Sequence, residues 1–303
     1  MKRVIVTGAN GFIGSSLTKR LLQAGTEVVA IDISFRNSRL APSKLLTTIE
    51  TQIDNSLTEK IPAGDYDAFY HLAWRGVNGQ EKADPDIQLA NVNMAIICAK
   101  ACKTLGVPRL LCAGTVAENA VFSLPYLSST NGGMIYGTAK HACHLFLDTF
   151  CKNIGVNCIW MQFSNIYGIG NMTGNLVSYT LQEILSDKDA TFGPAQQPYD
   201  FIYIDDLIEA IVRLGDAVNS RTTYFIGSGS PRPLHEYLSE IGSLSGRQER
   251  IKIGIRNDDG VRYDFSMFDT SPLRQDIGEY VTTPFGEGIK KTISWMLHTD
   301  DEE

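Results

Sequence analysis

The sequence predicts an α/β fold, with a doubly wound parallel sheet and a smaller C-terminal α+β lobe. The chain has 303 residues, of which 43% are hydrophobic, which is enough for one large domain with a substantial core and a smaller lobe. Short apolar segments alternate with helical patterns as far as residue 163, and such alternation is typical of βαβ units in a parallel sheet. In the first of these units, a glycine-rich turn separates the strand from the helix.

The first unit predicts a site for a pyrophosphate group. An apolar strand at residues 4–6 is followed by glycines at positions 8, 11 and 14, and then by a helix at 15–23. Gly8 allows the tight turn, Gly11 lets the backbone approach the phosphates, and Gly14 lets the helix pack close to the strand. The N–H groups at the start of that helix are then placed to bind the anion.

The second strand, at residues 27–31, ends in an acidic residue, Asp32. A carboxylate about 20 residues after the glycines is placed to bind a ribose hydroxyl. It also disfavours the 2′-phosphate of NADP by charge repulsion, although Arg36, four residues on, can accommodate such a phosphate. NAD is therefore the favoured cofactor, and NADP is the alternative.

The remaining elements follow in the same alternation. We expect further strands at residues 48–53, 68–73, 109–113, 158–163 and 223–226, and a short strand followed by a helix at 200–214. We expect further helices at 87–105, 135–153, 176–185, 234–243 and 288–297. A glycine- and asparagine-rich segment at 168–174 predicts a lobe boundary. The expected division is a dinucleotide-binding Rossmann domain at 1–168, to which 200–226 returns, and mainly a substrate-binding lobe at 169–303.

Two side chains of the helix at 135–153 form a candidate proton-transfer pair. Tyr136 and Lys140 are four residues apart and share one helix face, with Cβ atoms roughly 5–6 Å apart. A phenol has a pKa of about 10, and a nearby ammonium group lowers that pKa. Such a tyrosine can donate or accept a hydroxyl proton while hydride moves at the same carbon, and the lysine can reach the nicotinamide ribose. Thr115, which follows Gly114 at the end of the fifth strand, can hydrogen-bond the same substrate oxygen.

Composition excludes several other functions. The net charge of −7 and the lack of any run of Lys and Arg argue against nucleic-acid binding. No stretch approaches the roughly 18 apolar residues that a membrane span needs. The spacing of His141 and His144 suits a metal, but the sequence offers no further ligand, so no metal site is expected. The six scattered cysteines form no C-x-x-C pair, which predicts reduced thiols of a cytoplasmic protein.

Six stretches together resemble the extended short-chain dehydrogenase/reductase family, in its nucleotide-sugar epimerase/dehydratase branch. The resemblance covers nearly the whole chain and specifies the family better than the substrate. The stretches are TGANGFIG at 7–14, HLA at 71–73, NVN at 91–93, YGTAK at 136–140, NIYG at 165–168 and DFIYIDD at 200–206.

The resemblance implies a role for each matching residue. It implies catalytic roles for Thr115, Tyr136 and Lys140, and contacts with a nucleotide-diphosphate sugar for Thr115, Asn165 and Arg262. For Arg262, a solvated surface charge is the alternative. Within the cofactor set, Asp54 is expected near the adenine, and Asn91 is expected to brace the active site. The cofactor-binding residues that it implies are Gly8, Gly11, Phe12, Ile13, Gly14, Asp32, Asp54, Leu72, Ala73, Asn91 and Lys140.

The sequence also departs from the family pattern, and the departures concern the substrate more than the cofactor. The family's fifth strand usually ends in Ser-Ser or Ser-Thr, whereas here the end of the strand reads Ala113-Gly114-Thr115. Gln162 and Tyr199 stand where arginines are common, and Trp74 follows His-Leu-Ala, where a small residue is frequent. Glu118 can be interpreted as an extra acid near the sugar or as a loop carboxylate, and the second interpretation is favoured.

The resemblance implies an NAD-dependent nucleotide-diphosphate-sugar 4-epimerase that acts through a transient 4-keto sugar. A nucleotide-diphosphate 4-keto-6-deoxy-sugar reductase is the alternative. Dehydration is less favoured, because Val116 and Ala117 stand where dehydratases usually carry Asp-Glu. A cofactor-sensing protein without turnover is disfavoured, because such proteins lose the catalytic trio, which is present here. A homodimer is expected through the helices at 87–105 and 135–153.

Overall fold

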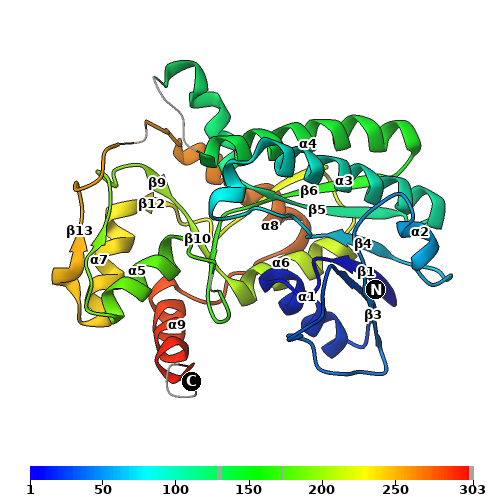
Figure 1. Ribbon diagram of the computed structural model, residues 1–303, viewed down its shortest axis with the longest axis horizontal. Coiled ribbons are helices and arrows are strands. Elements are labelled where there is room, and N and C mark those ends of the chain that lie inside the picture. Colours follow the sequence, from blue (N-terminus) through cyan, green and yellow to red (C-terminus); the bar gives the residue numbers. More distant parts are fainter. Residues whose placement is uncertain (128–131, 172, 259, 300–303) are drawn as a thin grey trace.

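Seven parallel strands form the central sheet of the computed structural model, which describes residues 1–127, 132–171, 173–258 and 260–299. Their order across the sheet is β11-β6-β5-β4-β1-β2-β3, and every neighbouring pair is parallel. Helices cover both faces (Figure 1). The predicted fold class, a doubly wound α/β sheet with a smaller lobe, is confirmed. The strands are β1 (Arg3–Thr7), β2 (Glu27–Asp32), β3 (Leu46–Glu50), β4 (Ala68–His71), β5 (Arg109–Thr115), β6 (Asn157–Phe163) and β11 (Thr223–Ile226).

Two long helices, α3 (Pro85–Leu105) and α4 (Gly132–Ile154), cover one face of the sheet, and α1 (Phe12–Gln23), α6 (Ile204–Asp216) and α8 (Ser271–Ile277) lie on the other (Figure 1). The short helix α2 (Leu57–Lys60) precedes β4. All six cysteines are buried free thiols in the core between the sheet and the α3–α4 layer. They therefore pack as small hydrophobic side chains.

The smaller lobe is built from short strands and helices between β6 and the C-terminus. Three two-stranded pairs join distant segments, namely β7 with β10, β9 with β12 and β8 with β13. The chain returns to the main sheet through α6, which packs on α1, and through β11, which pairs with β6. The strands are β7 (Asn165–Tyr167), β8 (Ala190–Thr191), β9 (Pro198–Tyr199), β10 (Phe201–Tyr203), β12 (Arg232–Pro233) and β13 (Ile251–Lys252), and the helices are α5 (Leu176–Leu185), α7 (Leu234–Ser245) and α9 (Phe285–Thr299).

The third strand differs from its predicted position. The sequence suggested residues 48–53, whereas β3 spans Leu46–Glu50, because the parallel register with β2 pairs Val28 with Leu46 and Asp32 with Glu50. Asp54 therefore lies beyond the strand, in the turn before α2.

The described residues also form four 3₁₀ helices that the sequence does not predict, of which η2 (Val116–Tyr126) has the greatest effect on the site because it directly follows β5. The others are η1 (Gln80–Ala83), η3 (Gln248–Arg250) and η4 (Phe265–Phe268). Within the described part of the chain, none of the helices has the length and apolar character needed to span a bilayer.

Candidate active site

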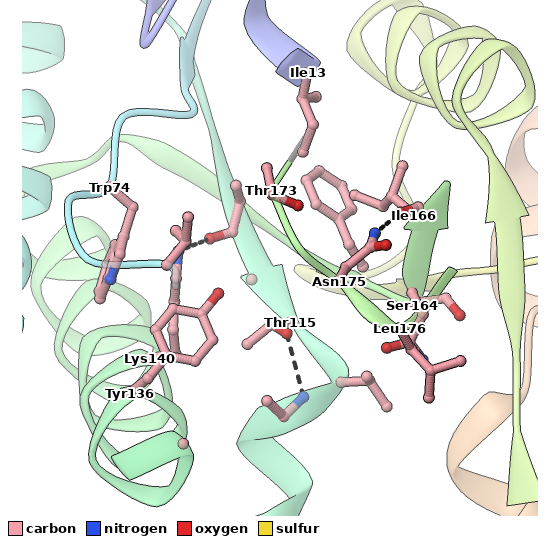
Figure 2. A pocket seen from close by; sticks show the side chains of 18 of the residues that line it. Ile13, Trp74, Thr115, Tyr136, Lys140, Ser164, Ile166, Thr173, Asn175 and Leu176 are labelled. Atoms are coloured by element: carbon pink, nitrogen blue, oxygen red, sulfur yellow. Dashed lines mark hydrogen bonds between the residues drawn. The ribbon is translucent and has the colours of Figure 1, made fainter. Parts of the chain in front are cut away.

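A cleft of about 530 Å³ lies at the carboxyl ends of the central strands. Its walls come from the glycine turn after β1, the ends of β4 and β5, the first turns of α4, and the start of the smaller lobe around β7 and β9. Figure 2 shows Tyr136 and Lys140 projecting from one helix, with Trp74 and Thr115 on either side of the Tyr136 ring. Segments far apart in the sequence thus meet in one cavity, which is where open α/β sheets bind ligands.

The glycine turn is shaped to let a diphosphate approach the backbone. Gly8 has a φ of +70°, and a Cβ there would lie 2.7 Å from the backbone nitrogen of Ala73. A Cβ on Gly14 would lie 1.9 Å from the carbonyl oxygen of Gly8, so only glycine lets α1 start so close to the turn. Helix α1 begins after Gly11 without a side-chain cap, which leaves the N–H groups of its first turn available to an anion. These residues therefore fit the pyrophosphate of a dinucleotide. The predicted cofactor residues that line the cleft are Gly8, Gly11, Phe12, Ile13, Gly14, Leu72 and Lys140.

The two acidic residues predicted to bind the cofactor, Asp32 and Asp54, have different surroundings. Asp32, at the end of β2, accepts hydrogen bonds from the backbone N–H groups of Asn10 and Ile33, both at 2.8 Å, so its carboxylate stands beside the glycine turn. Asp54 accepts from the Ser56 N–H at 2.9 Å and pairs with Lys60 at 3.5 Å. Hydrogen bonds from Ser56 hold the pKa of Asp54 below its usual value. Asp54 is not among the residues that line the cleft, and its contact with adenine remains a prediction.

Asn91 ties helix α3 to the loop after β4. Its side-chain oxygen accepts from the N–H of Arg75, and its amide nitrogen donates to the carbonyl oxygen of Arg75, both at 2.8 Å. One turn earlier, Gln88 accepts from the indole nitrogen of Trp74 at 2.8 Å and donates to the carbonyl oxygen of Gly76 at 2.9 Å. Both amide side chains are almost fully buried. They fix the loop that presents Trp74 to the cleft.

The candidate catalytic residues come together, but their electrostatics differ from the expectation. Burial raises the pKa of Tyr136, and a hydrogen bond with Thr115 opposes the rise. The Lys140 ammonium donates to the Ala113 carbonyl oxygen at 2.7 Å and lies 3.6 Å from the centre of the Trp74 ring. Burial lowers the pKa of Lys140 to about 8. The expected lowering of the tyrosine pKa by this lysine is therefore absent in this structure, because the ammonium is turned toward the carbonyl group and the indole.

Of the two predicted substrate residues that follow β6, one lines the cleft. Asn165 lines it, and its amide donates to the carbonyl oxygen of Asp200 at 3.0 Å. The side chain of Arg262 is 64% exposed and pairs with Asp258 at 2.6 Å, an arrangement that matches a surface charge. Its neighbours Val261 and Tyr263 line the cleft instead.

Sequence reasoning missed Lys82. This residue of η1 lines the cleft, and its ammonium lies 5.1 Å from the centre of the Tyr136 ring. Burial lowers the pKa of Lys82. Among the described residues that line the cleft, the charged side chains are Lys82 and Lys140. No local pattern marks Lys82, because its position depends on the packing of η1 against α4.

Glu118 is not among the described residues that line the cleft, and it lies buried in η2 and not in an exposed loop. Its side chain is 1% exposed, and it accepts from the backbone N–H of Thr115 at 2.7 Å. The Thr115 hydroxyl in turn accepts from the N–H of Ala117 at 3.2 Å, which completes a capping box at the start of η2. The T-x-x-E spacing is the sequence signal that would have located this turn.

The two histidines of α4 belong to aromatic contacts. His141 lies edge-on to Phe122, and His144 stacks on Trp160 with ring centres 4.9 Å apart. In the part of the chain that the structure describes, no group of three or more His, Cys, Asp or Glu side chains is arranged to hold a metal ion.

Comparison with known proteins shows which family this chain matches and which proteins resemble it in sequence and fold. The model of the NAD dependent epimerase/dehydratase family matches residues 4–227. The UDP-glucose 4-epimerase of Mycolicibacterium smegmatis is 24% identical, with 97% of this chain and 98% of that protein covered. The dTDP-4-dehydro-6-deoxy-D-allose reductase of Streptomyces bikiniensis is also 24% identical, with 98% and 97% covered. The structure of a UDP-N-acetylglucosamine 4-epimerase from Methanobrevibacter ruminantium M1 has the same fold, with a TM-score of 0.81, 20% identity, and 98% and 99% covered.

Proposed function

Because this chain belongs to the NAD-dependent epimerase/dehydratase family, we propose that it is a nucleotide-diphosphate-sugar 4-epimerase that acts through a transient 4-keto sugar. The resemblance recognised in the sequence is confirmed, and the family is one of NAD-dependent enzymes. The observation that carries the proposal is the meeting of Thr115, Tyr136 and Lys140 in the cleft that also contains the glycine turn. A hydride carrier and a proton carrier can therefore act on the same carbon.

The proposed reaction returns the enzyme to its starting state. NAD, when bound, supplies a reversible acceptor for the hydride of the sugar C4. Tyr136 takes the proton of the C4 hydroxyl as the hydride leaves, and it gives the proton back when hydride returns to the other face. Thr115 hydrogen-bonds the same oxygen and holds it beside the phenol. Lys140 supplies a donor for the nicotinamide ribose, and its positive charge favours the phenolate once the ammonium turns from the Ala113 carbonyl group toward the phenol. No electrons or protons are gained or lost over the cycle.

The charge of the cleft supports anionic ligands. The protein as a whole has a formal net charge of −7, yet the described residues that line the cleft include two lysines and no Asp or Glu. A dinucleotide and a nucleotide-diphosphate sugar each bring a diphosphate, and lysines bind phosphates as point charges. The carboxylate of Asp32 beside the glycine turn supports NAD over NADP, because a 2′-phosphate would meet a like charge there.

A 4-keto-6-deoxy-sugar reductase is the second candidate, since the reductase from Streptomyces bikiniensis is as similar in sequence as the epimerase from Mycolicibacterium smegmatis. Mass spectrometry of the purified protein will identify the retained cofactor. A screen of nucleotide sugars with and without NADPH then separates the candidates. An epimerase interconverts sugars without added reductant, whereas a reductase consumes one NADPH per turnover. Failure of every nucleotide sugar to react in either condition would contradict both functions.

We also propose a homodimer formed through α3 and α4. Large apolar side chains are exposed on these helices, including Leu89 on α3 and Leu145 and Phe146 on α4, which are 63%, 57% and 58% exposed. Exposed apolar side chains on adjacent helices favour burial against a second copy. A cytoplasmic location is proposed as well, and the six free cysteines support it.

A further inference from the structure

Glu118 is a buried carboxylate directly behind the catalytic threonine. One of its oxygens accepts from the N–H of Thr115 at 2.7 Å, and the indole nitrogen of Trp160 donates to both oxygens at 3.1 Å. The side chain is 1% exposed, so these donors replace the water that it would otherwise bind. The position of Thr115 at the end of β5 therefore depends on this carboxylate.

His144 and Thr223 continue the contacts around Glu118 to β11, at the edge of the sheet. The Nδ1 atom of His144 is 3.5 Å from Glu118, its ring lies parallel to Trp160, and its Nε2 atom is 2.9 Å from the hydroxyl oxygen of Thr223 on β11. With the proton on Nδ1, the imidazole donates toward Glu118 and accepts from the threonine hydroxyl. The carboxylate is thus held on the side away from the cleft by groups from α4, β6 and β11.

Gly114 makes room for this arrangement. A Cβ at position 114 would lie 2.3 Å from the indole nitrogen of Trp160 and 2.7 Å from a carboxylate oxygen of Glu118. Any side chain there would displace one of the two. Two departures from the family pattern are therefore structurally linked. One is the glycine that replaces serine before the catalytic threonine, and the other is the presence of Glu118.

Glu118 and Lys140 bind the same end of β5, where Lys140 donates to the carbonyl oxygen of Ala113 and Glu118 accepts from the N–H of Thr115, two residues on. Among the groups that face this lysine, burial holds the pKa of His71 at about 3, so its imidazole is neutral. Burial raises the pKa of the Cys143 thiol to about 12 and that of Cys112 to about 11, so both are neutral where the lysine titrates. A negative charge on Glu118 opposes the lowering of the Lys140 pKa by burial. Without that charge, the ammonium would lose its proton at lower pH.

We propose that Glu118 is a positioning residue of this active site, which fixes Thr115 at the cleft and places a negative charge near Lys140. The inference rests on the proposed function only for its catalytic consequence, because the charge and the contacts are properties of the free protein. Trp160, His144 and Gly114 belong to the same unit, since they donate to the carboxylate or leave space for it.

The direct test measures the titration of Lys140 without any nucleotide sugar. Protein labelled with ¹³C at the lysine Cε is titrated by NMR, and the Lys140 signal is identified by its loss in Lys140→Met. We expect a midpoint near the value of about 8 in the unchanged protein. In Glu118→Gln, the midpoint should fall by roughly one pH unit, since one nearby unit charge is removed. The amide oxygen can still accept from Thr115, and His144 can accept from the amide nitrogen in its other tautomer. An unchanged midpoint overturns the charge role.

The catalytic test separates charge from position. In Glu118→Gln, the alkaline limb of the pH profile of kcat should move to lower pH by the same amount as the NMR midpoint. Glu118→Asp keeps the charge but is too short to hold Thr115, so kcat should fall about tenfold with the limb unmoved. This variant also tests the inference if Glu118→Gln does not fold. His141→Asn on the same helix should match the unchanged protein in both measurements.

Two outcomes of the catalytic test contradict the inference. Coincident profiles for Glu118→Gln and the unchanged protein contradict the charge role, and full activity in Glu118→Asp contradicts the positioning role. A shifted NMR midpoint in a protein that acts on no nucleotide sugar contradicts the proposed function and leaves the charge role standing.

Discussion

Alanine substitutions in the glycine turn should affect the stability of the protein and its binding of NAD to different degrees. Alanine at position 14 would place a Cβ 1.9 Å from the Gly8 carbonyl oxygen, whereas alanine at position 11 would place it 3.2 Å from the same oxygen. Ordinary contact begins at 3.4 Å, so Gly14→Ala requires a shift of about 1.5 Å (3.4 minus 1.9) and Gly11→Ala one of about 0.2 Å (3.4 minus 3.2). The two variants therefore strain the protein very differently while adding the same methyl group.

The expected effects follow from those displacements. Gly14→Ala should lower the free energy of unfolding by about 1–3 kcal/mol, the usual range for overpacking, whereas Gly11→Ala should leave it nearly unchanged. Both variants should bind NAD less tightly. In Gly11→Ala, the added methyl group occupies the space through which the diphosphate approaches the backbone. Each charge-assisted hydrogen bond lost costs about 1.5–3 kcal/mol, or roughly tenfold to hundredfold in Kd.

Two measurements on protein freed of cofactor check this prediction. Denaturant unfolding gives the stability of each variant, and isothermal titration calorimetry gives the Kd for NAD. A Gly11→Ala protein that is stable and binds NAD as tightly as the unchanged protein would contradict this prediction. The diphosphate would then lie somewhere other than over the glycine turn.

Three further predictions concern catalysis, the cleft charge and assembly. Tyr136→Phe should lower kcat by about 10²–10⁴-fold and leave NAD binding intact. As a control, Tyr126→Phe should change neither quantity, because Tyr126 is 87% exposed. A normal kcat in Tyr136→Phe would contradict the assigned mechanism. Lys82→Gln should raise the KM for the nucleotide sugar about tenfold with a smaller effect on kcat, and an unchanged KM in steady-state kinetics would show that this lysine does not bind the substrate. The double substitution Leu145→Glu and Phe146→Glu should convert the dimer into a monomer in sedimentation, and a monomeric unchanged protein would exclude the dimer.

Local sequence patterns were sufficient to predict the main sheet and the candidate cofactor turn. The turn at Gly8 and Gly14 is encoded locally, because a positive φ and a close backbone approach both require the absence of a Cβ. The long helices α3 and α4 were predicted within a few residues, since their ends carry strong signals. Asp84 caps α3, and Gly106 ends it in the left-handed conformation. The short, exposed strand β3 was misplaced because its bounds depend on pairing with β2.

Local patterns in the chain are enough to predict the fold class, the family and the identity of the residues at the strand ends. How those residues face one another depends on the folded chain. In the folded chain, Glu118 is buried behind Thr115, the Lys140 ammonium faces the Trp74 ring, and the Lys82 ammonium lies near the Tyr136 ring. The physical reason is that burial and charge depend on groups distant in the chain. A local pattern can specify where a backbone turns, but not which side chains the folded chain will bring against it.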